Sequence, residues 1–520
     1  MLAKILMLVV FFSVMIGVGF YCSRHSTNVN GFVLGGRSVG PWLTAFAYGT
    51  SYFSAVIFVG YAGQFGWKFG LASTWIGIGN ALIGSLLAWI ILGRRTRIMT
   101  QALDTSTMPQ FFEKRFDSKV IKLVASIIIF VFLIPYTASL YNGLSRLFGM
   151  AFNVDYSVCI IVMAVLTAIY VIAGGYMATA INDFIQGIIM LFGIFAIIFS
   201  VLKLNGGFTA SVEALAHVTD SAVSSQPGVF ASFFGPDPLG LLSVVILTSL
   251  GTWGLPQMVQ KFYAIKSEEA VHKGTVISTL FAMIVAGGCY FLGGFGRLFN
   301  VDIVKDGYDA IIPQMISKLS PALVGITLVL VLSASMSTLS SLVLTSASTL
   351  TLDFINPLAF KNSKYNEYIM EQKTLIIIKV FVAVFIVISA VIAIVQYKVN
   401  LSFIAQLMGL SWGALAGSFL APFLYSLYWK NTTKTACYVS FAWGSGIMLL
   451  NMFCKNIFPV VLQNPINCGA LAMIGGLIIV PLVSIFTKKP PMENVDKIFS
   501  CYDRRVTVPV TDSLSEAESI

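Results

Sequence analysis

Charged residues are scarce in this sequence. Asp, Glu, Lys and Arg make up 10% of the 520 residues, whereas hydrophobic residues make up 57%. A soluble globular chain carries about 25% charged residues. So little charge cannot cover a surface that faces water, and lipid is therefore the expected solvent. The composition excludes a disordered chain, a coiled coil, a collagen and a disulfide-rich secreted domain.

Histidine is also scarce, and the cysteines are not clustered. The three histidines, His25, His217 and His272, fall in predicted loops that lie far from one another. A membrane-embedded enzyme would need a histidine, an acid pair or a nucleophile dyad within the bilayer. The seven cysteines form no CxxC pair, and most lie in apolar runs, where cysteine behaves as a small hydrophobe. The sequence therefore predicts neither an enzyme nor a metal–thiolate site.

Long apolar runs are abundant, and each can form a helix of about 20 residues that crosses a bilayer. We place thirteen spans at 3–22, 42–66, 71–92, 120–142, 157–175, 183–203, 240–260, 275–297, 321–348, 373–396, 401–428, 436–454 and 467–487. The first is predicted to be retained, because no small-x-small cleavage motif ends it. The chain is thus expected to be an all-α integral membrane protein.

The distribution of Lys and Arg predicts the orientation of these spans. If the loops alternate between two sides, one side holds nine of the 32 Lys and Arg residues, and its long loop at 204–239 holds none. The N-terminus is therefore expected outside and the C-terminus inside. This bias explains the net charge of +10 without a nucleic-acid partner. The expected partners are membrane lipid and a small-molecule solute, and the oligomeric state stays open, with a monomer as one alternative.

Two spans carry glycine and hydroxyl residues at their centres. The second span contains AYGTSYFSA at 47–55, and the seventh contains TSLGTWGLPQ at 248–257. Such segments can unwind, and the freed carbonyls are costly in lipid unless they line a cavity or bind an ion. The two segments lie five spans apart, as in an inverted repeat of five helices. The alternative is that the small residues only let helices approach closely.

An inverted repeat divides the chain into five parts. These are an extra N-terminal helix at 1–22, repeat one at 42–203, repeat two at 240–428, two further helices at 436–487, and a cytoplasmic tail at 490–520. The tail is expected to be disordered, because its end is rich in Ser, Thr and Glu.

Oxygen-bearing side chains mark two further spans. Ser337, Ser340, Ser341 and Ser348 share one face of the ninth span. Hydroxyl and carbonyl oxygens are hard ligands that suit sodium, although such hydroxyls can also bond back to their own helix. Asp183, at the predicted start of the sixth span, is either a functional carboxylate within the membrane or a helix N-cap.

Four stretches together resemble the sodium/solute symporter family, which includes sodium/proline, sodium/galactose, pantothenate and sialic acid transporters. The stretches are 54–63, 174–186, 260–270 and 336–341. The resemblance implies the leucine-transporter fold and solute import driven by sodium through alternating access. The location it implies is a cell membrane, and the short loops and the absence of long extensions favour a bacterial inner membrane. A transporter-like sensor is a remote alternative, because the tail is too short for a kinase.

The resemblance also implies the cation ligands. A first sodium ion would bind the backbone carbonyls of Thr50, Phe53 and Ala334 and the hydroxyls of Ser337 and Thr338. Some family members bind a second sodium ion, and the matching residues here are Asp183, Ser337, Ser340 and Ser341. One or two sodium ions per cycle are therefore expected.

The solute is less closely defined by the resemblance. The positions that would line its pocket are Tyr52, Ser54, Val56, Tyr136, Thr248, Thr252 and Trp253. One acidic and three aromatic positions of the proline pattern are replaced, and Val56 and Ile57 stand where the galactose pattern has polar residues. A small amino acid or carboxylate is the favoured solute. Proline, pantothenate, a sugar and sialic acid are the alternatives.

Overall fold

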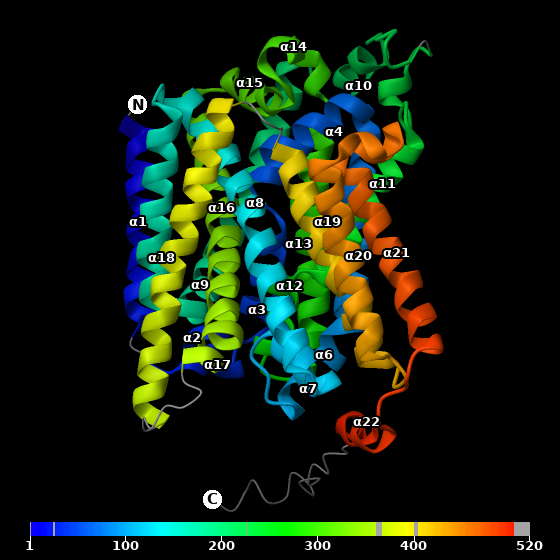
Figure 1. Ribbon diagram of the computed structural model, residues 1–520. Helices are drawn as coiled ribbons and strands as arrows, with labels where there is room; N and C mark the ends of the chain where they lie inside the picture. The colour runs from blue at the N-terminus through cyan, green and yellow to red at the C-terminus, as the bar shows by residue number, and fades with distance from the viewer. Residues whose placement is uncertain (1, 24–26, 225, 360–366, 400–403, 504–520) are drawn as a thin grey trace, which may run out of the picture.

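The computed structural model is a bundle of long helices that run between two faces of the molecule (Figure 1). It describes residues 2–23, 27–224, 226–359, 367–399 and 404–503. The short helices α10 (Phe208–Ala216), α14 (Ile303–Asp306) and α15 (Ile311–Ser317) lie at the upper face in Figure 1. The helices α7 (Met108–Phe116) and α22 (Met492–Phe499) lie toward the lower face.

The remaining helices form the body of the bundle. They are α1 (Leu2–Ser23), α2 (Val29–Leu34), α3 (Pro41–Tyr52), α4 (Ala62–Phe69), α5 (Thr74–Gly79), α6 (Arg94–Ala102), α8 (Lys119–Phe152), α9 (Tyr156–Leu204), α11 (Pro238–Gly254), α12 (Pro256–Ala264), α13 (Glu268–Gly293), α16 (Pro321–Thr349), α17 (Asn356–Ala359), α18 (Glu367–Val399), α19 (Ile404–Tyr428), α20 (Lys434–Phe453) and α21 (Pro465–Phe486). The protein is an all-helical membrane protein, as predicted.

Ten helices within the described residues are long and apolar enough to cross a membrane, and the bent pair α11–α12 makes eleven. Two of the ten, at 56–102 and 156–204, contain 47 and 49 residues. A straight helix of 49 residues would extend about 74 Å, more than twice the bilayer core of about 30 Å. Gly70 and Gly175 interrupt them with φ of 63° and 56°. Dividing both helices at these glycines would raise the eleven candidate spans to the thirteen that the sequence predicts.

Both predicted helix breaks are present. The helix α3 ends at Tyr52, where Phe53 adopts an extended conformation (φ −91°, ψ 124°). Between α11 and α12, Leu255 adopts nearly the same conformation (φ −79°, ψ 121°), and the two helices are bent by 46°. Pro256 can begin α12 but cannot continue α11, because it lacks an N–H group. The chain therefore unwinds at the two positions that the Gly- and hydroxyl-rich segments indicated.

The helix α16 lies at the centre of the bundle, where it contacts α3, α8, α9, α12 and α18. Its residues from Val331 to Thr349 are all buried, and its hydroxyl groups therefore face other helices. The second helix buried along most of its length is α19, which contacts α8, α11, α20 and α21. These two helices carry the surfaces against which the broken segments pack.

The chain after the last span differs from the expectation of a disordered tail at 490–520. Residues Met492–Phe499 form α22, with Val495 and Phe499 buried. These apolar residues recur at helical spacing and can cover one face of a helix. The Ser- and Thr-rich composition that suggested disorder belongs to the end of the tail, and residues 504–520 lie outside the described part of the chain.

The conformation of Gly175 generates a prediction about stability. Its φ of 56° and ψ of −151° lie in a region that is essentially restricted to glycine. A Cβ atom would also lie 2.8 Å from the carbonyl oxygen of Phe32. We expect Gly175→Ala to lower the melting temperature of the purified protein, because the strain costs about 1–3 kcal/mol.

Gly446 provides the matched control, because a Cβ atom there has nothing within 4 Å. Gly446→Ala, within α20, should leave the melting temperature unchanged or slightly higher. Equal melting temperatures for Gly175→Ala and the unmodified protein would contradict this account of the interruption.

Candidate functional site

The break in α3 directs backbone carbonyls toward α16. The amide of Ala55 would normally donate to the carbonyl of Ser51 within a helix. Instead it donates to the hydroxyl of Ser335 on α16, at 3.2 Å. The Ser51 carbonyl is thereby released, and the neighbouring carbonyls of Thr50 and Phe53 lie on the same unwound turn. The break thus replaces a helical turn with a set of oxygens that face α16.

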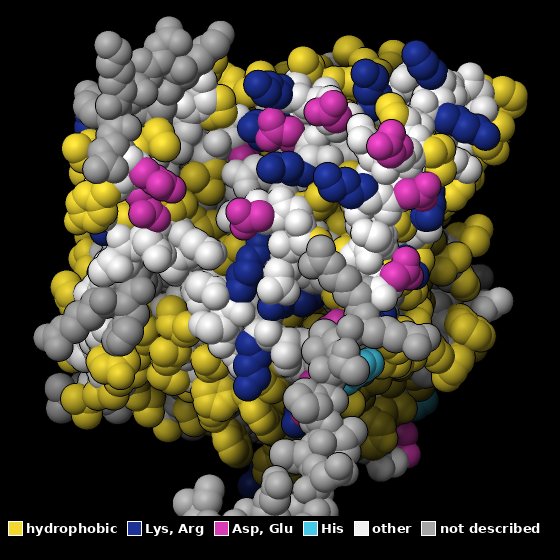
Figure 2. Space-filling view, turned by 90° about the horizontal axis from the view of Figure 1, so that it is seen from below, with side chains coloured by type: hydrophobic (Ala, Val, Ile, Leu, Met, Phe, Trp, Pro, Cys, Tyr) yellow, Lys and Arg dark blue, Asp and Glu magenta, His cyan; other side chains and the backbone are white. Residues whose placement is uncertain are grey.

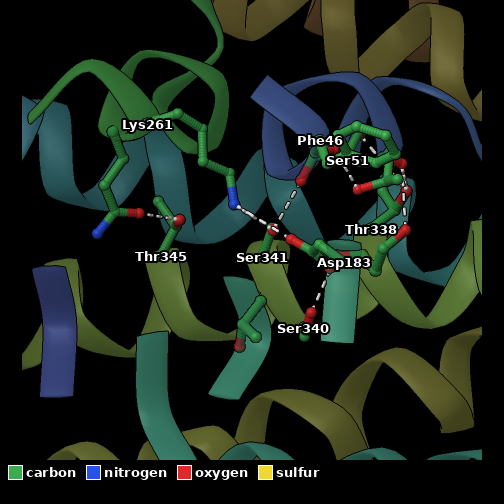
Figure 3. Close-up of polar contacts among 12 residues, drawn as sticks. Phe46, Ser51, Asp183, Lys261, Thr338, Ser340, Ser341 and Thr345 are labelled. Carbon is green, nitrogen blue, oxygen red and sulfur yellow. Dashed lines mark hydrogen bonds and ion pairs between the residues drawn. The ribbon is translucent and has the colours of Figure 1, made fainter. Parts of the chain in front are cut away.

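Two hydroxyl groups of α16 meet these carbonyls (Figure 3). The Ser337 hydroxyl lies 3.1 Å from the Thr50 carbonyl and 3.0 Å from the Ala334 carbonyl. Thr338 Oγ1 lies 3.0–3.4 Å from four carbonyl oxygens, those of Thr50, Ser51, Phe53 and Ala334. All five residues predicted for the first sodium site are therefore brought together, and Ser51 is an additional contact that the sequence did not indicate.

The number of acceptors at Thr338 exceeds the number of protons. A hydroxyl group carries one proton and donates it to one acceptor at a time. The Thr338 proton can therefore satisfy only one of the four carbonyls that surround it in this fully buried place. A cation satisfies such a group of oxygens, because every one of them can act as a ligand. The arrangement suits a hard monovalent ion held by neutral oxygens.

A second polar group lies beside this cluster and consists of Asp183, Lys261 and Ser341, here called the Asp183 pocket. Asp183, on α9, is fully buried, and neither carboxylate oxygen has a hydrogen-bond partner among the described residues. The Lys261 ammonium of α12 lies 3.8 Å from Asp183 Oδ2 and donates to the Ser341 hydroxyl at 2.9 Å. The Ser341 hydroxyl in turn lies 2.9 Å from the hydroxyl of Ser51 (Figure 3).

The residues predicted for a second sodium ion are thus only partly joined. Ser341 and Asp183 are linked through Lys261, whereas the Ser340 hydroxyl donates to the Ser337 carbonyl at 2.9 Å. The N-cap alternative for Asp183 is wrong, because this residue lies inside α9, eight positions beyond the interruption at Gly175.

Lys261 is the main difference from the sequence-based expectation. The predicted span at 240–260 leaves Lys261 in the loop that follows, yet its side chain is 2% exposed. The predicted span ended at residue 260, whereas Pro256 begins a new helix that extends to Ala264. Pro256 was the signal that helical structure resumes after the break and carries Lys261 into the protein.

Aromatic rings gather beside the end of α3. The Tyr52 ring stacks on the Trp412 ring at 5.9 Å, and the Tyr136 ring meets Trp412 edge-on at 5.9 Å. The Ser54 hydroxyl, the Tyr136 hydroxyl and the Trp412 indole N–H are buried next to one another, and none has a hydrogen-bond partner elsewhere in the described part of the chain. Unpartnered buried polar atoms are uncommon, and a small polar ligand would satisfy them.

Trp412 was missed by the sequence analysis. It lies in α19 between Ser411 and Gly413, deep in the bundle rather than at a membrane interface, where tryptophan is usual. A mid-span tryptophan flanked by small residues was the available signal.

The other predicted pocket residues are engaged elsewhere. The Thr248 hydroxyl donates to Asn80 at 2.8 Å, the Thr252 hydroxyl to the Gly84 carbonyl at 2.9 Å, and the Trp253 indole to the Ile83 carbonyl at 2.9 Å. These bonds hold α11 against the segment at 80–87. The Thr248 carbonyl nevertheless accepts from the Tyr52 hydroxyl at 2.9 Å, and Val56 is a buried apolar side chain just after the break.

Comparisons with known proteins show the family and the fold of the chain. Residues 32–444 match the model of the Sodium:solute symporter family. Sodium/proline symporters of Staphylococcus aureus strains JH9 and JH1 are each 30% identical over 502 residues, which cover 93% of this chain and 93% of each relative. A solved structure of a Na+-coupled sialic acid symporter, substrate-bound and outward-open, superimposes with a TM-score of 0.72. It is 17% identical and covers 94% of this chain and 98% of its own.

The oxygen cluster predicts how sodium binding responds to mutation. Thr338→Ala removes the group that faces four carbonyls and should raise the sodium concentration for half-maximal thermal stabilisation of the purified protein. With about 1–3 kcal/mol for an unmet partner, the expected increase is about 5- to 150-fold. Ser337→Ala should act in the same direction with a smaller effect, because its hydroxyl faces two carbonyls.

Two controls separate ion binding from general damage to α16. Thr338→Ser keeps the hydroxyl and should retain most of the sodium affinity. Ser346→Ala removes another buried hydroxyl of the same helix and should leave the sodium affinity unchanged. Unaltered sodium dependence in both Thr338→Ala and Ser337→Ala would exclude the cluster as the ion site.

Proposed function

Because the chain belongs to the sodium:solute symporter family and is a sodium-coupled solute symporter, we propose that it imports a small amino acid or carboxylate. The sodium ion that drives import binds the carbonyls of Thr50, Phe53 and Ala334 and the hydroxyls of Ser337 and Thr338. The observation that carries this assignment is the convergence of four carbonyl oxygens on the Thr338 hydroxyl. The Asp183 pocket already holds one cationic group, the Lys261 ammonium.

The aromatic group beside the break supports a small solute. The rings of Tyr52, Tyr136 and Trp412 offer apolar contact area, and the polar groups beside them are the hydroxyls of Ser54 and Tyr136 and the indole N–H of Trp412. Three such groups suit a carboxylate or an amino group better than the many hydroxyls of a sugar. Proline, which the relatives from Staphylococcus aureus are named for, falls within this class.

The two breaks support alternating access by two inverted repeats, at 42–203 and 240–428. Phe53 and Leu255 share an extended backbone conformation, and the segments that they interrupt lie five predicted spans apart. Ion and solute bind where these segments meet α16 and α19. Movement of the broken segments relative to those helices would open the site to one side of the membrane at a time.

Uptake into proteoliposomes tests the proposed solute class. An inward sodium gradient should drive accumulation of at least one member of a panel of small amino acids, including proline, and small carboxylates. Replacement of external sodium by potassium should abolish it. Sodium-driven uptake of galactose or sialic acid, with no uptake of the small solutes, would contradict the proposal.

The charge distribution predicts that the lower face in Figure 1 is cytoplasmic. Lys and Arg are spread over this face, together with fewer Asp and Glu (Figure 2). A cavity of about 570 Å³, at the junction of α7, α20 and the segment before α22, is lined by Lys114, Arg115, Lys434, Lys488, Lys489 and Lys497. Burial of Lys261 removes one residue from the count that set the orientation, and the bias toward this side is retained.

Cysteine labelling in intact cells tests the orientation. In a Cys454→Ser background, which removes the exposed cysteine among the described residues, a membrane-impermeant maleimide should label Ser221→Cys and not Lys273→Cys. Both positions are exposed and lie on opposite predicted sides. Permeabilisation should make Lys273→Cys reactive. The reverse pattern in intact cells would invert the topology.

A further inference from the structure

We propose that the Lys261 ammonium is the resident cation of the Asp183 pocket and occupies the place that a second sodium ion would take. One sodium ion then accompanies each solute molecule. The inference rests on the proposed sodium site at Thr338, and it assigns a role in ion stoichiometry to a residue of α12. Lys261 acts by excluding an ion rather than by contacting the solute.

Lys261 and Asp183 bring two opposite buried charges together. Its ammonium lies 3.8 Å from Asp183 Oδ2, donates to Ser341 at 2.9 Å and lies 5.1 Å from the centre of the Tyr176 ring. The side chains of Lys261 and Asp183 are 2% and 0% exposed. A buried charge persists only when it is paired, and each of these two residues supplies the partner of the other. The pocket as a whole is therefore neutral.

A sodium ion in the same pocket would meet two obstacles. The first is that the Ser341 hydroxyl, one of its four expected ligands, already contacts both Lys261 and Ser51. The second is repulsion between two cations beside one carboxylate. At a separation of about 4 Å and an effective dielectric constant of about 20, this repulsion weakens binding about a thousandfold. An ion site would form only after the ammonium is removed.

Lys261 also joins the two broken segments. Ser51 lies at the break of α3, where its carbonyl is 3.4 Å from Thr338 Oγ1 and its hydroxyl is 2.9 Å from Ser341 Oγ. Lys261 extends this chain of contacts from Ser341 to α12, which follows the second break. The tethered ammonium therefore remains beside the first sodium site without being released with the ion.

The stoichiometry has a consequence for the gradient that the protein can sustain. A membrane potential of about 100 mV contributes about 2.3 kcal/mol for each ion that moves inward. This corresponds to about 50-fold accumulation of a neutral solute for one sodium ion. Two ions would square this factor. A symporter with a tethered ammonium therefore sustains a smaller solute gradient than a two-ion symporter. In return, it uses one sodium ion for each solute molecule instead of two.

Counting bound sodium tests the inference directly. Purified full-length protein is titrated with ²²Na⁺ at pH 7 and pH 9, and sodium dependence of solute uptake is measured in proteoliposomes. The unmodified protein should bind one ion with a Hill coefficient of one. Lys261→Met keeps a long side chain without the charge. It should bind two ions at one or both pH values, with a Hill coefficient above one.

The double variant Lys261→Met/Asp183→Asn is the matched control, because it removes both charges and should bind one ion again. Two ions bound by the unmodified protein would overturn the inference even if no Lys261 variant folds. A folded Lys261→Met that still binds one ion at both pH values would also overturn it. Failure of the proposed function has a different signature, namely no sodium binding to the unmodified protein, or binding unaffected by Thr338→Ala.

Discussion

The backbone groups released where α3 breaks are the constraint on which the site depends. Carbonyl oxygens within a membrane protein have no water to bind and are costly when left without a donor. The structure collects those of Thr50, Ser51 and Phe53 around Thr338 of the buried helix α16. An ion that satisfies them favours the conformation in which α3 and α16 are held together. Under the proposed assignment, ion binding and the packing of α3 against α16 depend on one set of contacts.

Several parts of this arrangement could be predicted from the sequence, because they follow from local chemistry. Glycine and hydroxyl residues near residue 50 and Pro256 near residue 255 indicated both helix breaks, since neither segment can hold a regular helix as well as its flanks. The spacing of Ser337 and its neighbours placed the hydroxyls on one helix face. The family resemblance then supplied the ligand set that the structure brings together.

Other parts depend on tertiary structure and could not be predicted in the same way. Lys261 was assigned to a loop because a lysine at the end of an apolar run usually reaches water, and only the placement of α12 against α9 and α16 buries it beside Asp183. Trp412 lies far along the chain from Tyr52 and Tyr136, and no local pattern links the three rings. The helix α22 was not predicted, because the Ser-, Thr- and Glu-rich residues that follow it suggested disorder for the whole tail.

An experimental structure at a resolution that reveals bound ions, determined in sodium and again in potassium, tests the central claim most directly. The account predicts sodium-dependent density enclosed by the carbonyls of Thr50, Phe53 and Ala334 and the hydroxyls of Ser337 and Thr338. Ion density that appears only against the Asp183 carboxylate, with none at Thr338, would contradict it.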